Sequence, residues 1–355
     1  MPFAGVIGQE RAKALLTAWL ESKRMPHAVL VSGPVGTGKR RLALELAQAL
    51  NCVSGDACGQ CSSCQKIEAV GHPDIHILVP LPSRAGERSE ARLTSEAHTA
   101  ALEYIKRDYV PPRSNVNIAR LQIRLLQREM VYAPVEANYK IALIFDAERM
   151  HPAGANALLK MLEEPPAYAI FILVTSAEER MLPTVLSRCQ RVPVQPLSPD
   201  HMRGQLTAWG VGPQSLEVAV RLGEGNLYRA RQVAEGSFDE IRQHVEAFLQ
   251  GGATGQEEAY WSILDQVGKR SERGLLEDFL HMCGVYLRDL YLMDHGRGDE
   301  VANVDRRPFL QELEGHFTSA RIEAAAEAVD GAFARLDHNV NTNLILVALW
   351  RRLRS

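Results

Sequence analysis

Residues 33–40 read Gly-Pro-Val-Gly-Thr-Gly-Lys-Arg and fit the phosphate-binding pattern G-x4-G-K. The apolar run Ala28–Ser32 precedes this loop and predicts a strand, and a helical spacing of apolar residues follows Lys39. The glycines of the pattern are Gly33, Gly36 and Gly38. Glycine lets backbone N–H groups turn toward phosphate oxygens, and the helix N-terminus adds positive potential. The pattern therefore predicts a nucleotide-binding loop in which Lys39 reaches the outer phosphates; a plain glycine-rich turn is the alternative.

The residue after the lysine argues against hydrolysis. Loops that hydrolyse nucleotide place Ser or Thr there, because the hydroxyl binds Mg²⁺. This chain has Arg40, which carries no acceptor atom and cannot ligate a cation. We expect ATP binding to remain available through Lys39 and the backbone, and metal-assisted hydrolysis to be impaired.

Four cysteines lie within 13 residues, with spacings of five, two and two residues between them: Cys52, Cys58, Cys61 and Cys64. Four thiolates in so short a stretch favour a tetrahedral zinc ion, and a site saturated by protein ligands is structural. Free or disulfide-bonded cysteines are the alternative, disfavoured in a reducing compartment. His72 lies nearby, and we expect it to be structural.

The first half of the chain alternates between strand and helix patterns. The expected strands are Ala28–Ser32, Asp74–Val79, Ile141–Phe145 and Ala169–Thr175, and expected helices follow Lys39 and cover Ile118–Val131 and Asn156–Glu164. This alternation predicts the α/β class, with a parallel sheet covered by helices on both faces.

The remaining segments predict helices. Residues 81–117 indicate a polar insertion with one amphipathic helix at about Ser89–Arg107, and strand patterns disappear after Pro196. We expect an α/β core at 1–166, extended to about 196 by its last strands. A small helical domain is expected at 197–235 and a larger helical domain at 236–355, with a loop or hinge at Gly251–Gly255.

Composition excludes several classes of protein. The 355 residues carry a formal net charge of −3, which excludes a strongly basic protein that coats DNA. We find neither an apolar run of bilayer-spanning length nor an N-terminal signal-peptide pattern. We therefore expect a cytoplasmic protein with no membrane partner.

Several short motifs occur in a fixed order: Ile7–Gln9, the phosphate loop, the cysteine cluster, Ala157–Pro165 (ALLKMLEEP) and Leu186–Cys189 (LSRC). Together they resemble the clamp-loader branch of AAA+ proteins, over residues 1 to about 235. The resemblance implies a RecA-like core, a small helical lid and a helical collar domain that mediates oligomerisation. The last third resembles that collar in length and helical character.

Three departures distinguish subunit types within the family. Arg40 replaces Ser or Thr. Asp146 would lie beside the phosphate loop, but Ala147 stands where the family has the glutamate that polarises water. Tyr228 stands where hydrolysing, tau/gamma-type subunits have a sensor arginine. These departures favour the non-hydrolysing, delta-prime type.

Two residues keep the hydrolysing alternative open. Glu148 follows Ala147, and it either acts as the base through a bent turn or points away and leaves the base missing. Arg229 follows Tyr228 and leaves the sensor alignment open.

Arg188 is the candidate catalytic residue, acting in trans. In this family the arginine of Ser-Arg-Cys enters the nucleotide site of the neighbouring subunit. A guanidinium there neutralises charge on the transferring phosphoryl group, an effect of about 10³–10⁵ in rate. A surface arginine is the alternative.

The resemblance implies a part in the DNA polymerase III holoenzyme. The chain would be a stator in a pentamer with delta and tau/gamma subunits, which uses ATP to open the sliding clamp and place it on primed DNA. Its cofactors would be structural zinc and, without hydrolysis, ATP. A catalytically active tau/gamma-like ATPase and a standalone zinc- and nucleotide-binding DNA repair protein are the alternatives.

Overall fold

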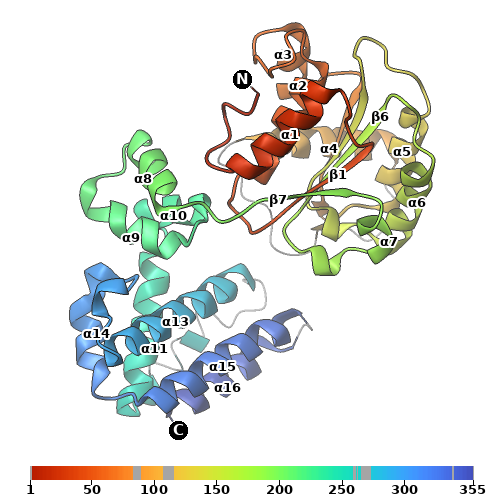
Figure 1. Cartoon of the computed structure of the whole chain (residues 1–355). Coiled ribbons are helices and arrows are strands. Elements are labelled where there is room, and N and C mark those ends of the chain that lie inside the picture. Colours follow the sequence, from red (N-terminus) through yellow and green to blue (C-terminus); the bar gives the residue numbers. More distant parts are fainter. Residues whose placement is uncertain are drawn as a thin grey trace. The chain divides into compact units, whose positions relative to one another are not determined.

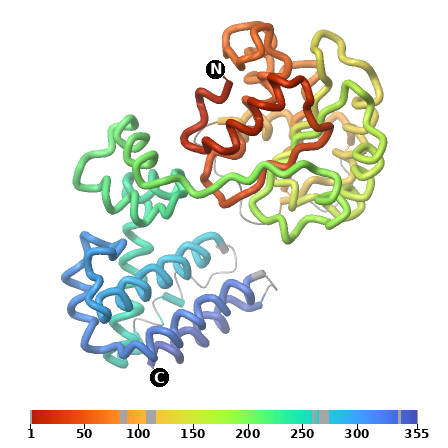
Figure 2. Tube along the Cα trace, viewed as in Figure 1, coloured from red at the N-terminus to blue at the C-terminus, as the bar shows by residue number. Residues whose placement is uncertain are grey.

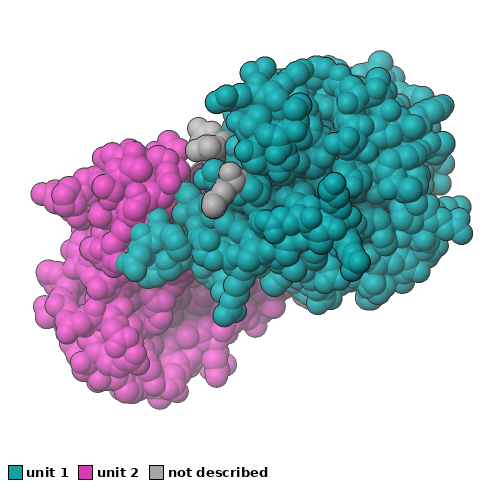
Figure 3. All heavy atoms as spheres, turned by 45° about the horizontal axis from the view of Figure 1, so that its top comes forward, with its two compact units in different colours: residues 1–201 teal, residues 202–355 magenta. Residues whose placement is uncertain are grey.

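The computed structural model describes residues 2–82, 89–106, 116–258, 261, 263–264, 273–337 and 340–354. The chain forms two units, residues 1–201 and 202–355 (Figure 3). The finer division of the helical part at about residue 235 stays a prediction.

A parallel sheet organises the first unit (Figure 1). Its strands are β1 (Ala28–Ser32), β2 (Ile75–Leu78), β5 (Lys140–Ile144), β6 (Ala169–Thr175) and β7 (Gln190–Pro193), in the order β2-β5-β6-β1-β7. β1 pairs with β6 on one side and β7 on the other, so segments far apart in sequence lie side by side (Figure 2). All residues of β1, β5 and β6 are buried, as expected of strands covered on both faces.

Helices cover both faces of this sheet. One face packs against α1 (Glu10–Ser22), α2 (Lys39–Asn51), α3 (Ser62–Glu68) and α4 (Glu90–Ile105). The other packs against α5 (Arg120–Met130), α6 (Pro152–Glu163) and α7 (Pro183–Leu186). Alternate strand residues serve the two cores: Val29 and Val31 face the first, and Ala28 and Leu30 the second. This confirms the predicted α/β class.

The helices expected at Asn156–Glu164 and at about Ser89–Arg107 both form, with slightly different bounds. α6 begins at Pro152, not at Asn156, because proline is favoured in the first helical turn and the His151 ring caps the Ala153 N–H at 3.2 Å. The helix expected in the insertion is confirmed as α4, capped by the Ser89 hydroxyl. The short antiparallel pair β3 (Leu81–Pro82) and β4 (Val116–Asn117) flanks the insertion.

Helices alone form the described part of the chain after β7, as predicted. They are α8 (Pro199–Ala208), α9 (Pro213–Gly223), α10 (Leu227–Ala234), α11 (Asp239–Thr254), α13 (Arg273–Asp294), α14 (Arg307–Glu314), α15 (Ser319–Asp337) and α16 (Thr342–Arg354), with 3-10 turns at Gly298–Glu300 and Val304–Arg306. Across the described residues, none of the helices combines the length and apolar character needed to cross a bilayer.

The expectation of a loop at Gly251–Gly255 is wrong. α11 continues through Thr254 and ends at Gly255, whose φ of +77° is typical of a helix C-cap. A Cβ at Gly252 would lie 3.1 Å from the Leu353 Cβ, so this glycine lets α11 approach α16 closely. Packing between two helices, which local composition does not encode, decides this segment.

We predict that Gly33→Ala destabilises the first unit more than Gly38→Ala. Both residues have positive φ, but a Cβ at Gly33 would lie 2.0 Å from the Val194 carbonyl oxygen, whereas one at Gly38 would meet nothing within 4 Å. Backbone conformation alone accounts for about 1–2 kcal/mol, and the added overlap at Gly33 should raise its cost above about 3 kcal/mol. Thermal denaturation of both variants measures the difference, and equal melting temperatures would contradict it.

Candidate functional site

The predicted phosphate loop lies between β1 and α2. Gly33, Gly36 and Gly38 all have positive φ, at +149°, +77° and +88°. Gly38 is also the N-cap residue of α2, directly before the helix begins at Lys39. The sequence pattern therefore corresponds to a strand–loop–helix turn in which the three glycines adopt conformations that other residues rarely do.

Two side chains of this loop fold back onto it. The Thr37 hydroxyl donates to the Pro34 carbonyl oxygen at 2.8 Å, and the Lys39 ammonium donates to the same oxygen. Lys39 is buried, and burial lowers its pKa to about 8 against the opposing attraction of Asp146 and Glu148. The Pro34 carbonyl oxygen thus accepts a hydrogen bond from this cation, and the charges of two carboxylates attract it.

Arg40 and Asp146 are linked through Tyr104, from the C-terminal turn of α4. The Arg40 guanidinium lies 5.7 Å from the centre of the Tyr104 ring and donates to the Tyr104 carbonyl oxygen at 3.5 Å. The Tyr104 hydroxyl donates to the Asp146 carboxylate at 3.2 Å, and its ring stacks on Phe145. Tyr104 is 2% exposed. The insertion therefore contributes a buried aromatic residue beside the phosphate loop, which sequence reasoning missed because no local signal places α4 there.

A bent turn follows Asp146. Asp146 has a φ of +47°, and a 3-10 turn covers Ala147–Arg149. Ala147 is buried in the core, while the Glu148 carboxylate accepts a hydrogen bond from the Thr175 hydroxyl, at the end of β6, at 2.7 Å. Burial raises the pKa of Glu148, against this hydrogen bond and with the repulsion of Asp146. The turn thus directs Glu148 toward Asp146 and Lys39.

The four cysteines converge at the end of α2 and the start of α3. Their sulfur atoms all lie within 4.8 Å of one another, and those of Cys52 and Cys61 are 3.9 Å apart. A tetrahedral zinc ion with bonds of about 2.3 Å needs sulfur atoms about 3.8 Å apart, so the cluster fits this ion. All six cysteines of the chain are free in the structure, so the four thiols of the cluster are all available as ligands. The His72 ring instead accepts from the Asp74 N–H at 3.1 Å, as expected of a structural residue.

The environment of the cluster favours a cation. Although burial opposes it, hydrogen bonds with Ser54 and the Cys58 N–H lower the pKa of Cys52 to about 6. Burial raises the pKa of Cys64, with repulsion from Cys52 in the same direction. Four thiolates so close together repel one another, and a bound divalent ion removes that cost. When bound, zinc would cross-link the segment between α2 and α3.

Arg188 lies near the amino ends of the strands, whereas the phosphate loop lies at the carboxyl end of β1. It lies two residues before the start of β7, whose first residue, Gln190, pairs with Val29 near the start of β1, whereas the loop begins after β1 ends. The four residue steps from Val29 to Gly33 correspond to about 13 Å. The Arg188 guanidinium donates to Glu163 at 2.6 Å and to the Thr184 carbonyl oxygen at 2.9 Å. The structure therefore separates Arg188 from the nucleotide-binding candidates of its own chain.

Tyr228 and Arg229 lie in the first turn of α10. The Asn226 side chain caps this helix by accepting from the Arg229 N–H at 3.0 Å. The Arg229 guanidinium lies 2.6 Å from the His281 ring and 3.6 Å from the Glu224 carboxylate, both in the second unit. Arg229 is thus engaged in contacts within that unit.

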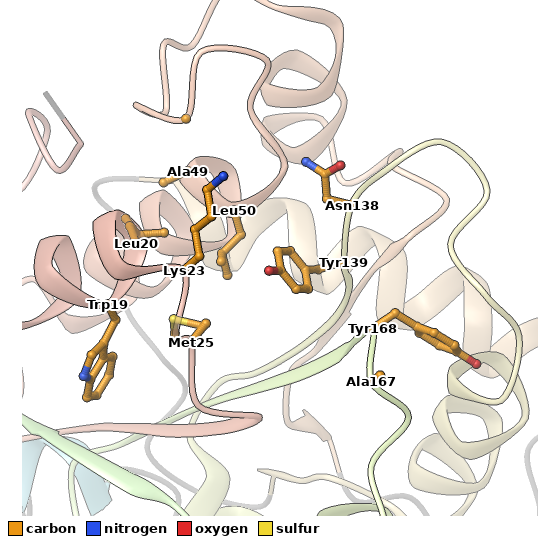
Figure 4. A pocket seen from close by; sticks show the side chains of 11 residues that line it. Trp19, Leu20, Lys23, Met25, Ala49, Leu50, Asn138, Tyr139, Ala167 and Tyr168 are labelled. Atoms are coloured by element: carbon orange, nitrogen blue, oxygen red, sulfur yellow. The ribbon is translucent and has the colours of Figure 1, made fainter.

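A cavity of about 620 Å³ lies at the amino ends of the strands (Figure 4). Tyr139, which precedes β5, and Tyr168, which precedes β6, line it together with Trp19 of α1. None of the site residues predicted from the sequence lines this cavity.

Comparison with known proteins identifies relatives over both parts of the chain. The family described as "DNA polymerase III, delta subunit" matches residues 8–198, and "DNA polymerase III, delta subunit, C terminal" matches residues 244–354. The "DNA polymerase III subunit delta'" of Bacillus subtilis is 28% identical over 337 residues, which cover 94% of this chain and 92% of that protein.

Two further matches cover different shares of the chain. The "DNA polymerase III subunit gamma/tau" of Mycobacterium tuberculosis is 34% identical over 207 residues, 58% of this chain, and the match spans 30% of that longer protein. A solved "gamma subunit-related protein" of DNA polymerase III from Thermotoga maritima has a TM-score of 0.42 and 17% identity, covering 96% of this chain and 98% of that one.

We predict one zinc ion per chain, bound by Cys52, Cys58, Cys61 and Cys64. Replacing Cys61 by Ser should release the ion and lower the melting temperature by about 5 °C or more, since the cross-link between α2 and α3 is lost. Elemental analysis of protein purified without added metal measures the content. Cys189→Ser, outside the cluster, is the matched control and should keep the ion. Metal-free protein of unchanged stability would refute the prediction.

Proposed function

The chain belongs to the DNA polymerase III delta subunit family, and on that premise we propose that it is the non-hydrolysing, delta-prime-type subunit of a clamp loader. It is a clamp-loader subunit related to both delta' and gamma/tau proteins. The match to delta' extends over almost the whole of both chains, whereas the match to gamma/tau covers 58% of this one.

The link between Arg40, Tyr104 and Asp146 is the observation that carries the non-hydrolysing proposal. A hydrolytic site needs a hydroxyl from the loop and an acidic side chain near the metal ion. Here a guanidinium takes the first position and would repel Mg²⁺, and the Asp146 carboxylate accepts from a buried tyrosine. The loop thus lacks a metal-binding hydroxyl, and the Tyr104 hydroxyl competes with a metal ion for one oxygen of Asp146, which makes hydrolysis unfavourable.

The position of Arg188 supports a role in trans. It lies about 13 Å or more along the sheet from its own phosphate loop, so its guanidinium does not serve that loop. It is partly exposed and presents a planar fork of N–H donors that matches phosphate oxygens. As a finger it would donate to the transferring phosphoryl group in a neighbouring ATPase subunit.

The partners follow from the family. We propose that delta and tau/gamma subunits flank this chain, that the helical domain at 236–355 forms the oligomeric collar, and that the chain meets the sliding clamp and primed DNA through the assembled complex. In this assembly the chain is a stator: it contributes an interface and Arg188, while its own phosphate loop keeps at most nucleotide binding.

A second candidate is the active ATPase. The bent turn after Asp146 directs Glu148 toward the site, and the Thr175 hydroxyl orients its carboxylate. Burial raises the pKa of Glu148, which is a property of general bases. Glu148 would act as the base in this alternative, with Arg40 tolerated.

We predict that the purified chain hydrolyses ATP no faster than its Lys39→Ala variant. Arg40 and Ala147 remove a metal ligand and the usual water-polarising base, so the wild type should have no turnover for the variant to lose. Steady-state ATPase measurements test this, with folding checked by circular dichroism because Lys39 is buried. A turnover that Lys39→Ala abolishes would establish the active-ATPase alternative.

We predict that Arg188→Ala preserves folding and assembly but reduces ATP turnover by the reconstituted complex. The affected interface should lose about 10³-fold or more, while the total rate falls partially because other sites keep their own fingers. Arg188→Lys should be nearly as impaired, since a point charge does not reproduce the fork. DNA-stimulated ATPase, with assembly checked by gel filtration, measures this. Full activity in the assembled Arg188→Ala complex would remove the finger role.

A further inference from the structure

The Arg188 guanidinium is held from two sides by its own chain. Glu163, the last residue of α6, accepts from Nη2 at 2.6 Å, and the Thr184 carbonyl oxygen accepts from Nη1 at 2.9 Å. The side chains of Arg188 and Glu163 are 34% and 49% exposed, so the pair lies at the surface.

The ion pair between Arg188 and Glu163 contributes little to the stability of the fold. Exposed ion pairs contribute little to stability, because water screens them and two long side chains lose freedom. A carboxylate at the C-terminal end of a helix also faces the negative end of the helix dipole, and Glu164 adds a second carboxylate there. The short contact between Glu163 and Arg188 therefore points to a role in orienting the arginine rather than in stabilising the fold.

We propose that Glu163 is a positioning residue that restricts the orientation of the Arg188 guanidinium before the nucleotide of the neighbouring subunit arrives; this inference rests on the proposed finger role of Arg188. An arginine side chain has many rotamers, and most would point the guanidinium away from any one phosphate. The bonds to Glu163 and Thr184 restrict these rotamers in the free subunit, so less freedom is lost when the finger engages.

The remaining donors suit this role. A guanidinium has five N–H donors in a fixed fork, and in Arg188 one contact uses Nη2, to Glu163, while Nη1 contacts the Thr184 carbonyl oxygen and the Ser187 hydroxyl. A phosphate carries more negative charge than one carboxylate. A phosphate would therefore accept hydrogen bonds from the exposed N–H groups of Arg188, and Glu163 would compete with it only weakly.

The test compares Glu163→Ala and Glu163→Gln with Glu164→Ala in reconstituted complexes. Glu164 is the matched control because it is an exposed carboxylate at the same helix end. Glu163→Ala should lower kcat for DNA-stimulated ATP turnover by part of the loss that Arg188→Ala causes, with KM nearly unchanged, since orientation of the finger matters in the transition state. Glu163→Gln, which keeps a neutral acceptor, should fall in between, and Glu164→Ala should match the wild type.

The same variants made in an Arg188→Ala background separate positioning from a merely structural role. If Glu163 acts through Arg188, Glu163→Ala should cause no further loss there. An equal loss with and without Arg188, an increase in turnover for Glu163→Ala, or a result equal to that of Glu164→Ala would overturn the inference while leaving the finger in place. If Arg188→Ala itself has no effect, the proposed function fails instead.

Discussion

The parallel pairing of β1 with β6 and β7 determines where the candidate functional groups lie. β1 is buried along its whole length, so a shift of one residue would turn its core side chains to the wrong face. With this register fixed, the carboxyl ends of β1, β5 and β6 bring together the phosphate loop, Asp146 and Thr175. The amino end of β7 places Arg188 at the other edge. The phosphate loop and Arg188 therefore lie at opposite ends of the strands of this sheet.

Local sequence predicted those parts that depend on local chemistry. β1 and β6 were predicted to the residue, because strands buried on both faces are nearly continuous apolar runs. The cysteine cluster could be predicted for a similar reason. Its four sulfur atoms come from 13 consecutive residues, so the chain has little freedom to keep them apart.

Contacts between distant segments could not be predicted. Tyr104 reaches Asp146 across 42 residues, and Glu163 reaches Arg188 across 25, and neither pair leaves a mark in the local pattern. The same limit explains Gly251 and Gly252, which composition assigns to a loop and which packing against α16 keeps within α11. The motifs of the site can thus be predicted from the sequence. The residues that contact those motifs, Tyr104 and Glu163, cannot, because their positions depend on how the insertion and the helices pack.

The position of β1 in the sheet also sets an order for events during synthesis. β1 completes its pairing when β7, ending at Pro193, has left the ribosome, whereas the last cysteine of the cluster emerges about 130 residues earlier. At about 5–20 residues per second, this interval is on the order of 10 s. The four thiols therefore leave the ribosome well before the last strand that the core of the first unit needs for its closure.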